Sequence, residues 1–201
     1  MPTSSLASRL HDNVMAKKAS LACEIRTRIA YGVARALEFL YAQGPGVCHG
    51  NIRSSNVLLA NCFYVRLSEH GMFRFFVPNS KFVLIPGYQA PEVENAFDVS
   101  PKSDVYSFGV LILELLSGKA PLEAIGKNTW VDLPSWVRVM FQEKPIIDVF
   151  DSMLLHNYQN FGEHMVQLLQ LANCCTFKNP SKRPSMVEVT NRINKTCHFR
   201  S

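Results

Sequence analysis

An apolar run near the middle of the chain constrains the fold most strongly. From Ser103 to Leu116 almost every residue is apolar, so the predicted helix has no polar face to present to water. Ser103 and Asp104 favour the start of a helix, and Gly118 stands where this helix should end. The most apolar stretch, Val110 to Leu116, carries Glu114 in its middle, and no stretch of the chain reaches the about 18 apolar residues that a membrane span requires. Such a helix belongs at the centre of a folded domain.

The composition is typical of a folded intracellular protein. The 201 residues allow one large domain or two small ones, at roughly 150 residues per domain. Charged residues make up only 18% of the chain, against about 25% in typical proteins, so we expect apolar surface that meets a partner. The net charge of +5 is not gathered into a basic patch, which argues against nucleic-acid binding. The six cysteines form no C-x-x-C pair and follow no secretory segment, which favours a reducing compartment.

Other periodic patterns flank the central helix. Apolar residues recur at helical spacing over residues 24–42, and a Gly-Pro-Gly turn at residues 44–46 ends that pattern. Two short β-like stretches at residues 57–59 and 64–67 predict a hairpin, whereas residues 72–91 have no clear period and predict a loop. Further helices are predicted at residues 133–141, 163–175 and 185–193. The sequence therefore predicts one mostly helical domain with a small hairpin.

Five short motifs stand in an order that narrows the interpretation. Residues 48–56 read C-H-G-N-I-R-S-S-N, after a long helix and before a hairpin, and this order resembles the catalytic loop H-R-D-x-K-x-x-N of protein kinases. The other motifs are E-H-G at residues 69–71 where kinases have D-F-G, A-P-E at 90–92, S-D-V-Y-S-F-G at 103–109 and K-R-P-S at 182–185. Five markers in the kinase order indicate a protein-kinase-like fold.

The chain most resembles the plant leucine-rich-repeat receptor-like kinases whose catalytic loop reads H-G-N. Residues 131–137 and 165–172 are similar to that group, and the similarity runs from about Ser5 to Ile193. The resemblance implies an α+β, mainly α, C-terminal lobe of a kinase domain over residues 1–195, followed by a short tail at residues 196–201. We expect the N-terminal lobe to be absent, because the resemblance places the start of the chain just after the hinge and the chain contains no G-x-G-x-x-G phosphate loop.

The resemblance also implies altered residues at the catalytic positions. Asn51 stands where kinases have the catalytic aspartate, and its amide cannot accept the proton of a substrate hydroxyl. Arg53 stands at the position of the catalytic-loop lysine. Asn56 and Glu69 stand at the two metal-ligand positions, where the extra methylene of Glu69 weakens Mg²⁺ binding because that ion demands near-ideal geometry. We interpret these residues as remnants, and expect Mg-ATP as a cofactor only if residual kinase function remains.

Four further positions are implied to hold the kinase fold together. His49 matches a histidine that packs beneath the catalytic loop, and Asp104 matches an aspartate that holds the backbone of that loop. Glu92 and Arg183 match a buried ion pair, and breaking such a pair costs about 3–5 kcal/mol. The residues needed for folding are thus retained, while those needed for phosphoryl transfer are changed.

The remaining candidate groups favour structural roles. Gly50 replaces the arginine that pairs with a phosphorylated activation loop in many kinases, and Ser80 and Tyr88 are the hydroxyls that this loop offers, so activation by loop phosphorylation is not expected. Cys174 and Cys175 lie in a helical pattern and are interpreted as a core residue and its neighbour. Four histidines show no metal-ligand spacing and are interpreted as unpaired: His70, His156, His164 and His198.

These observations lead to three hypotheses of function. The first is an inactive pseudokinase that binds other signalling proteins, among them kinases or the missing N-terminal lobe. The second is a weakly active Ser/Thr kinase in which a longer product supplies the N-terminal lobe. The third is a truncated fragment without an independent role. In each case we expect no nucleic-acid partner, no membrane span in this chain, and an intracellular, cytoplasmic location, associated with the plasma membrane if the chain is part of a longer receptor.

Overall fold

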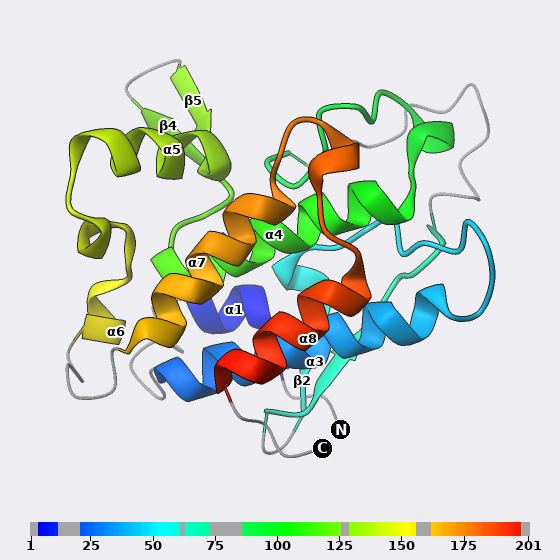
Figure 1. The fold of residues 1–201 in the computed structure, drawn as a ribbon, viewed down its shortest axis with the longest axis horizontal. Coiled ribbons are helices and arrows are strands. Elements are labelled where there is room, and N and C mark those ends of the chain that lie inside the picture. Colours follow the sequence, from blue (N-terminus) through cyan, green and yellow to red (C-terminus); the bar gives the residue numbers. More distant parts are fainter. Residues whose placement is uncertain are drawn as a thin grey trace.

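The protein is described by a computed structural model that covers residues 4–11, 21–60, 63–72, 86–125, 129–155 and 162–197 (Figure 1). Its helices and strands, in chain order, are β1 (Ser4–Ser5), α1 (Leu6–His11), α3 (Cys23–Tyr41), β2 (Val57–Leu59), β3 (Val65–Leu67), α4 (Pro101–Ser117), β4 (Leu122–Ile125), β5 (Thr129–Asp132), α5 (Leu133–Glu143), α6 (Ser152–Leu155), α7 (Glu163–Cys175) and α8 (Met186–Cys197). The mainly helical content with a small antiparallel sheet confirms the predicted fold class. Ser80, His156 and His198 lie outside the described residues.

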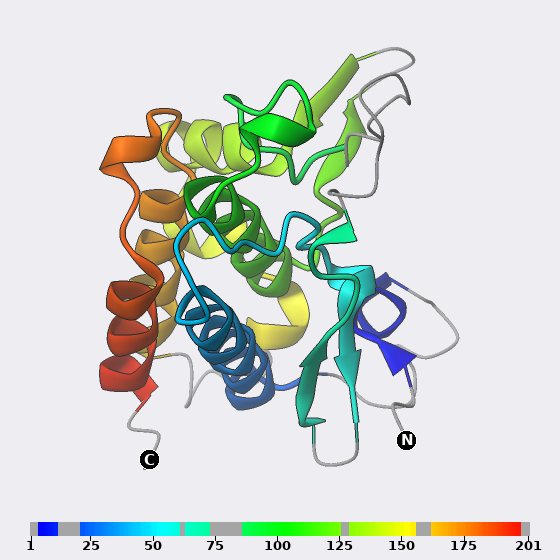
Figure 2. The same ribbon diagram turned by 90° about the vertical axis from the view of Figure 1, so that its right-hand side faces the viewer.

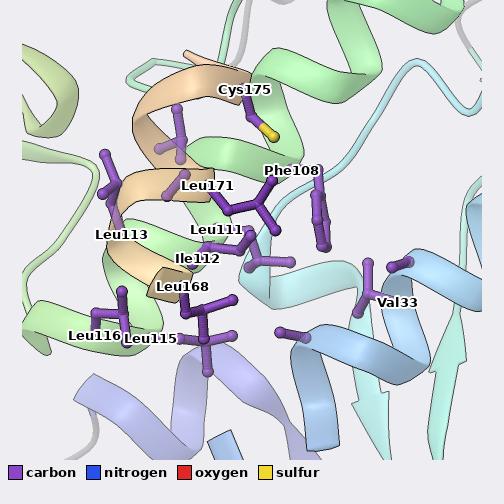
Figure 3. Packing of buried hydrophobic residues seen from close by; sticks show 14 of the residues in the cluster. Val33, Phe108, Leu111, Ile112, Leu113, Leu115, Leu116, Leu168, Leu171 and Cys175 are labelled. Atoms are coloured by element: carbon purple, nitrogen blue, oxygen red, sulfur yellow. The ribbon is translucent and has the colours of Figure 1, made fainter. Parts of the chain in front are cut away.

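Helix α4 lies at the centre of the domain, as its apolar sequence predicts. It packs against α7, α3 and α5. Side chains on several of its faces, including Phe108, Leu111 and Leu113, are fully buried. Figure 3 shows Leu168 and Leu171 of α7 lying against this helix. Each fully buried aliphatic or aromatic side chain stabilises the fold by about 1.5–3 kcal/mol, so the buried side chains of α4 and α7 contribute strongly to stability.

The start of α4 differs from the prediction. The N-cap is Ser100, whose Oγ accepts a hydrogen bond from the backbone N–H of Ser103 at 3.2 Å, while Ser103 Oγ accepts one from the N–H of Ser100 at 2.9 Å. Pro101 occupies the first turn, where its missing N–H has no cost. The prediction that Ser103 and Asp104 begin the helix was therefore wrong, since Ser103 completes a capping box. This leaves Asp104 inside the helix, with its carboxylate available to another segment.

The predicted hairpin is present and gains a third strand. Strand β2 pairs antiparallel with β3, with Val57 opposite Leu67, and β1 pairs with the other edge of β2. Strand β1 was not predicted, because two residues are too short for a periodic signal. Helix α3 contacts both β3 and α8 and lies between them in Figure 2. The sheet thus holds the segment after α3, which contains residues 48–56, against one side of the helical core.

A second, unpredicted hairpin precedes α5. Strands β4 and β5 pair antiparallel, and α5 follows directly, with Asp132 as its N-cap (Figure 1). Asp132 accepts a hydrogen bond from the backbone N–H of Ser135 at 2.9 Å. The bounds of α7 equal those predicted, and α8 continues beyond its predicted end at residue 193 to Cys197. In the part of the chain that the structure describes, no helix has the length and apolar character of a membrane span.

Candidate active site

The backbone of residues 48–51 is held by one buried carboxylate. Asp104 Oδ2 accepts a hydrogen bond from the N–H of His49 at 2.5 Å, and Oδ1 accepts one from the N–H of Gly50 at 2.8 Å. The hydroxyl of Tyr41 donates to the same carboxylate at 3.1 Å. Burial raises the pKa of Asp104 to about 6, although its three hydrogen-bond donors act in the opposite direction. Helix α4 therefore fixes the loop at His49 and Gly50 through Asp104, a side chain that takes no part in the capping box at the start of the helix.

Asn51 and Glu69 are in direct contact. The Asn51 side-chain amide donates a hydrogen bond to Glu69 Oε2 at 2.9 Å, and Arg53 Nη2 lies 3.4 Å from the same oxygen. Glu69 has a positive φ of 64°, a backbone conformation that is uncommon for residues other than glycine. The structure thus brings together three of the four residues that the sequence placed at the catalytic and metal positions, and they bind one another.

The fourth of these residues, Asn56, is buried and acts within the loop. Its side-chain N–H₂ donates to the carbonyl oxygen of Asn51 at 2.9 Å. Its own carbonyl oxygen accepts from the N–H of Ser68 at 3.0 Å, and Gly71 donates its N–H to the carbonyl of His49 at 2.8 Å. Residues 49–56 and 68–71 are therefore joined by hydrogen bonds on both sides of Asn51 and Glu69.

These contacts decide how well the site fits Mg²⁺. The donor set offers the Glu69 carboxylate and the amide oxygens of Asn51 and Asn56, and the guanidinium of Arg53 already lies beside the carboxylate. A hard divalent cation takes oxygen ligands in octahedral geometry and is repelled by a cation at that distance. Among the described residues, no group of three or more His, Cys, Asp or Glu side chains is placed to hold a metal ion. The Glu69 carboxylate would have to give up part of its contacts with Asn51 and Arg53 before it could bind Mg²⁺.

His49 lies beneath the loop in neutral form. It is almost fully buried, and its Nδ1 accepts a hydrogen bond from the N–H of Asn51 at 3.2 Å. Burial, with a smaller contribution from the nearby ring of His70, lowers the pKa of His49 to about 4. The imidazole therefore carries no charge at neutral pH and serves as a hydrogen-bond acceptor for the loop.

Glu92 and Arg183 join two distant parts of the chain. Arg183 Nη1 and Nη2 lie 2.5 and 2.7 Å from the two carboxylate oxygens of Glu92. The same guanidinium donates to the carbonyl oxygens of Lys102 and Phe177 at 2.9 and 2.7 Å, and its side chain is fully buried. The segment at residues 90–92 is thereby attached to the start of α4 and to the turn before α8.

Sequence reasoning missed a polar cluster around Glu114. This side chain is fully buried in α4, where Ser54 Oγ and His11 Nε2 each lie 2.7 Å from Oε1 and the hydroxyl of Tyr88 donates to Oε2. Burial and the neighbouring carboxylate raise the pKa of Tyr88 well above its usual range. The sequence did contain a signal for this cluster: Glu114 stands in an apolar stretch, and a buried carboxylate requires several hydrogen-bond donors. Tyr88, one of two hydroxyls noted in its segment, is thus a buried donor.

The histidine and cysteine predictions have mixed outcomes. His164 was interpreted as unpaired, but its Nε2 lies 3.1 Å from the sulfur of Cys23. That interpretation was wrong because the two residues are far apart in sequence and meet only where α3 and α7 begin. Cys175 is buried and Cys174 half-buried, as the helical pattern predicted.

Comparison with known proteins places this site in a family. Residues 1–193 match the family described as "Protein kinase domain". The chain belongs to the protein kinase family. Within that family it is 42% identical over 198 residues to "Probable inactive receptor kinase RLK902" of Arabidopsis thaliana, a match that covers 97% of this chain and 31% of that protein. It is also 35% identical over 212 residues to "Leucine-rich repeat receptor-like protein kinase PXC1" of the same plant, with 97% and 31% covered.

The solved structures agree with this assignment. The fold of this kinase domain matches the crystal structure of the maize SIRK1 (sucrose-induced receptor kinase 1) kinase domain bound to AMP-PNP, with a TM-score of 0.82 and 29% identity. The match covers 98% of this chain and 67% of that one. The chain spans less than a third of the length of the two curated relatives above. The resemblance to plant receptor-like kinases is therefore confirmed in both sequence and structure.

Proposed function

We propose that this receptor-like kinase domain does not transfer phosphate and acts as a module that binds other signalling proteins. The observation that carries the proposal is the hydrogen bond from the Asn51 amide to the Glu69 carboxylate. In an active kinase the corresponding positions hold two carboxylates that serve the substrate hydroxyl and the metal. Here the two side chains use their hydrogen-bonding groups on each other.

The loss of a carboxylate at residue 51 removes the base. General-base catalysis contributes about 10²- to 10⁴-fold to a rate, and it requires a group that accepts a proton. The Asn51 side chain offers a neutral amide whose N–H₂ is already donated to Glu69. The carboxylates that contact this loop serve other groups: Asp104 accepts from the backbone N–H groups of His49 and Gly50, and Glu69 accepts from Asn51. A hydroxyl bound beside Asn51 would keep its proton.

The changes around Glu69 also oppose phosphoryl transfer, because they affect the position that binds the metal ion in active kinases. Glu69 accepts hydrogen bonds from a neutral amide and lies beside a guanidinium, which balances its charge without any ion. Without the bound metal, the negative charge of a triphosphate would face Glu69 uncompensated. We therefore propose that the domain uses no Mg-ATP cofactor.

The retained contacts support a binding role. Asp104 holds the catalytic loop, and Arg183 holds Glu92, in a region where chemistry has been lost. Four of the similar Arabidopsis proteins are named "probable inactive receptor kinase", which supports the same proposal. A lobe that keeps its internal supports presents a fixed surface to partners. The proposal assigns this surface to the cytoplasmic side of a receptor, where other kinases or an N-terminal lobe would bind it.

A radiolabelled ATP assay on the purified chain tests the loss of catalysis. With Mg²⁺ and a general protein substrate, we expect no transfer above background, measured beside an active kinase domain. Transfer that disappears in Asn51→Ala would overturn the proposal and favour weak Ser/Thr kinase activity. Equal transfer in the wild type and Asn51→Ala would identify a co-purified kinase.

Thermal melting with Mg-ATP tests nucleotide binding separately. A ligand that binds only the folded state stabilises it by about 2.7 kcal/mol at 100 times its Kd. We expect no change in Tm at millimolar Mg-ATP. A rise in Tm that is lost in Glu69→Ala would contradict the part of the proposal that concerns the cofactor.

A further inference from the structure

Two sulfur atoms and an imidazole nitrogen meet where α3 and α7 begin. Cys23 is the first residue of α3, and its Sγ lies 3.1 Å from His164 Nε2 and 3.0 Å from Met165 Sδ. His164 and Met165 stand in the first turn of α7. We propose that Cys23, His164 and Met165 form a binding site for a soft monovalent cation of the copper(I) type.

The thiol, thioether and imidazole donors of this cluster favour copper(I) over other biological metal ions. A thiolate and a thioether are soft ligands that favour copper(I), whereas Mg²⁺ and Ca²⁺ prefer oxygen donors, and no carboxylate oxygen is given to the cluster. Although no three His, Cys, Asp or Glu side chains among the described residues are placed to hold a metal, this site has a methionine as its third donor and so lies outside that finding. The thioether also disfavours zinc, whose protein ligands are thiolate, imidazole and carboxylate.

The size and exposure of the cluster fit a small ion. Bonds of about 2.0 Å to nitrogen and about 2.3 Å to sulfur, as for a d¹⁰ ion, place the donors roughly 3.5–3.8 Å apart. The Cys23–His164 separation of 3.1 Å would open by about 0.4 Å and the Cys23–Met165 separation of 3.0 Å by about 0.8 Å, which the flexible methionine side chain can supply. Met165 is fully buried, while Cys23 and His164 are half-buried. The ion therefore enters from the side of Cys23 and His164, with the thioether at the bottom of the site.

The charge balance favours a monovalent ion. On binding, the Cys23 S–H bond breaks, its proton leaves to solvent, and the sulfur keeps the electron pair that forms the bond to the metal. The ion replaces one proton, charge for charge, so the half-buried site stays neutral.

Gly162 leaves the space that the imidazole occupies. A Cβ atom at this position would lie 2.9 Å from His164 Nδ1. Any side chain at residue 162 would therefore push the ring away from its present position beside Cys23. This residue supplies a test of the site that leaves all three donors in place.

Titration of the reduced chain with copper(I) under anaerobic conditions, in competition with the chromophoric chelator bicinchoninate, tests the proposal. We expect one copper(I) per chain to be withheld from the chelator. Cys23→Ser should lower the affinity by about 100-fold or more, and His164→Gln and Met165→Leu by about 10-fold each, on the scale of losses known for altered metal sites. Gly162→Ala should also weaken binding. Met165→Leu conserves side-chain volume, so its fold is expected to persist, which thermal melting checks.

Matched controls separate this cluster from other sulfur donors. Cys174→Ser removes a half-buried thiol at the far end of α7, and Met153→Leu removes an exposed thioether of α6. Both should bind copper(I) as the wild type does. X-ray absorption at the copper edge should show one nitrogen and two sulfur ligands, with one sulfur lost in Met165→Leu. Unchanged affinity in Cys23→Ser, or a copper spectrum that Met165→Leu leaves unchanged, would overturn the proposal.

Discussion

The guanidinium of Arg183 forms two parallel hydrogen bonds with the carboxylate of Glu92, at 2.5 and 2.7 Å, across ninety-one positions of sequence. The carbonyl oxygens of Lys102, Phe177 and Lys178 accept from the same side chain, which is completely buried. Because loss of Arg183 leaves three carbonyl oxygens without their donor and a Glu92 carboxylate that is only 27% exposed, this pair stabilises the attachment of the segment at residues 90–92 far more than a surface pair would.

Arg183→Ala is therefore expected to lower the free energy of unfolding by about 3–5 kcal/mol, measured by urea titration. The matched control is Arg192→Ala, which removes an arginine from the half-exposed pair with Glu188 in α8. Exposed pairs contribute only about 0–1 kcal/mol, so the control should differ little from the wild type. Equal losses in the two variants would show that the buried pair has no special weight.

Tyr88→Phe tests the cluster around Glu114. The hydroxyl of Tyr88 donates to Glu114 and also contacts Ser54, so its removal leaves a fully buried carboxylate short of one donor. An unmet buried group of this kind costs about 1–3 kcal/mol, which should appear as a lower free energy of unfolding in urea. Tyr64→Phe is the control, because that ring is 70% exposed. If both variants unfold at the same urea concentration as the wild type, the cluster does not stabilise the fold.

The sequence predicted those elements whose signal is local. Helix α4 follows from its apolar run, α7 from its helical period, and the hairpin of β2 and β3 from two short β-like stretches. Strand β1 is too short to give a periodic signal. The predicted start of α4 was three residues too late. Ser100 and Ser103 are both good N-cap residues, and only their reciprocal hydrogen bonds in the structure decide between them.

The sequence predicted which residues form the candidate active site, but it did not predict how their side chains contact one another. Motif order identified Asn51, Arg53, Asn56 and Glu69, but not that Asn51 donates its hydrogen bond to Glu69. That contact depends on the backbone of residue 69, which has a positive φ that no pattern in the sequence shows. The donors to Glu114 come from residues 11, 54 and 88, and the partners of Cys23 from residues 164 and 165. Such clusters arise only when distant segments fold together.

The stability of the domain between pH 4 and 6.5 should reflect two opposing titrations. Asp104 has a folded pKa of about 6, raised from 3.8 by burial, so the folded state binds its proton more tightly and stability falls as pH rises through this window. His49 has a folded pKa of about 4, lowered from 6.5 by burial, so stability rises with pH through nearly the same window. In the wild type the two contributions oppose each other, and we expect a shallow dependence.

Variants separate the two contributions. In His49→Asn only the Asp104 contribution remains, so the free energy of unfolding should fall by up to about 3 kcal/mol from pH 4 to pH 6.5, on the scale of about 1.4 kcal/mol per pKa unit. In Asp104→Asn it should rise by a similar amount over the same range. Urea titrations at four pH values measure both slopes. Parallel pH profiles in the wild type and both variants would contradict the assignment of these shifts.

Asn51→Asp tests whether the contact with Glu69 replaces a metal site. The change converts a hydrogen bond of 2.9 Å into a pair of facing carboxylates, and Arg53 compensates only one of them. Repulsion at this distance in a half-exposed setting should lower the free energy of unfolding by about 1 kcal/mol at neutral pH, and less at high ionic strength. Millimolar Mg²⁺ should restore the lost stability of Asn51→Asp, because two carboxylates now face a position that an ion can occupy. The wild type, and the control Asn51→Ser, should show no response to Mg²⁺. A wild type that gains as much stability from Mg²⁺ as Asn51→Asp does would mean that Glu69 binds the ion despite its contacts with Asn51 and Arg53.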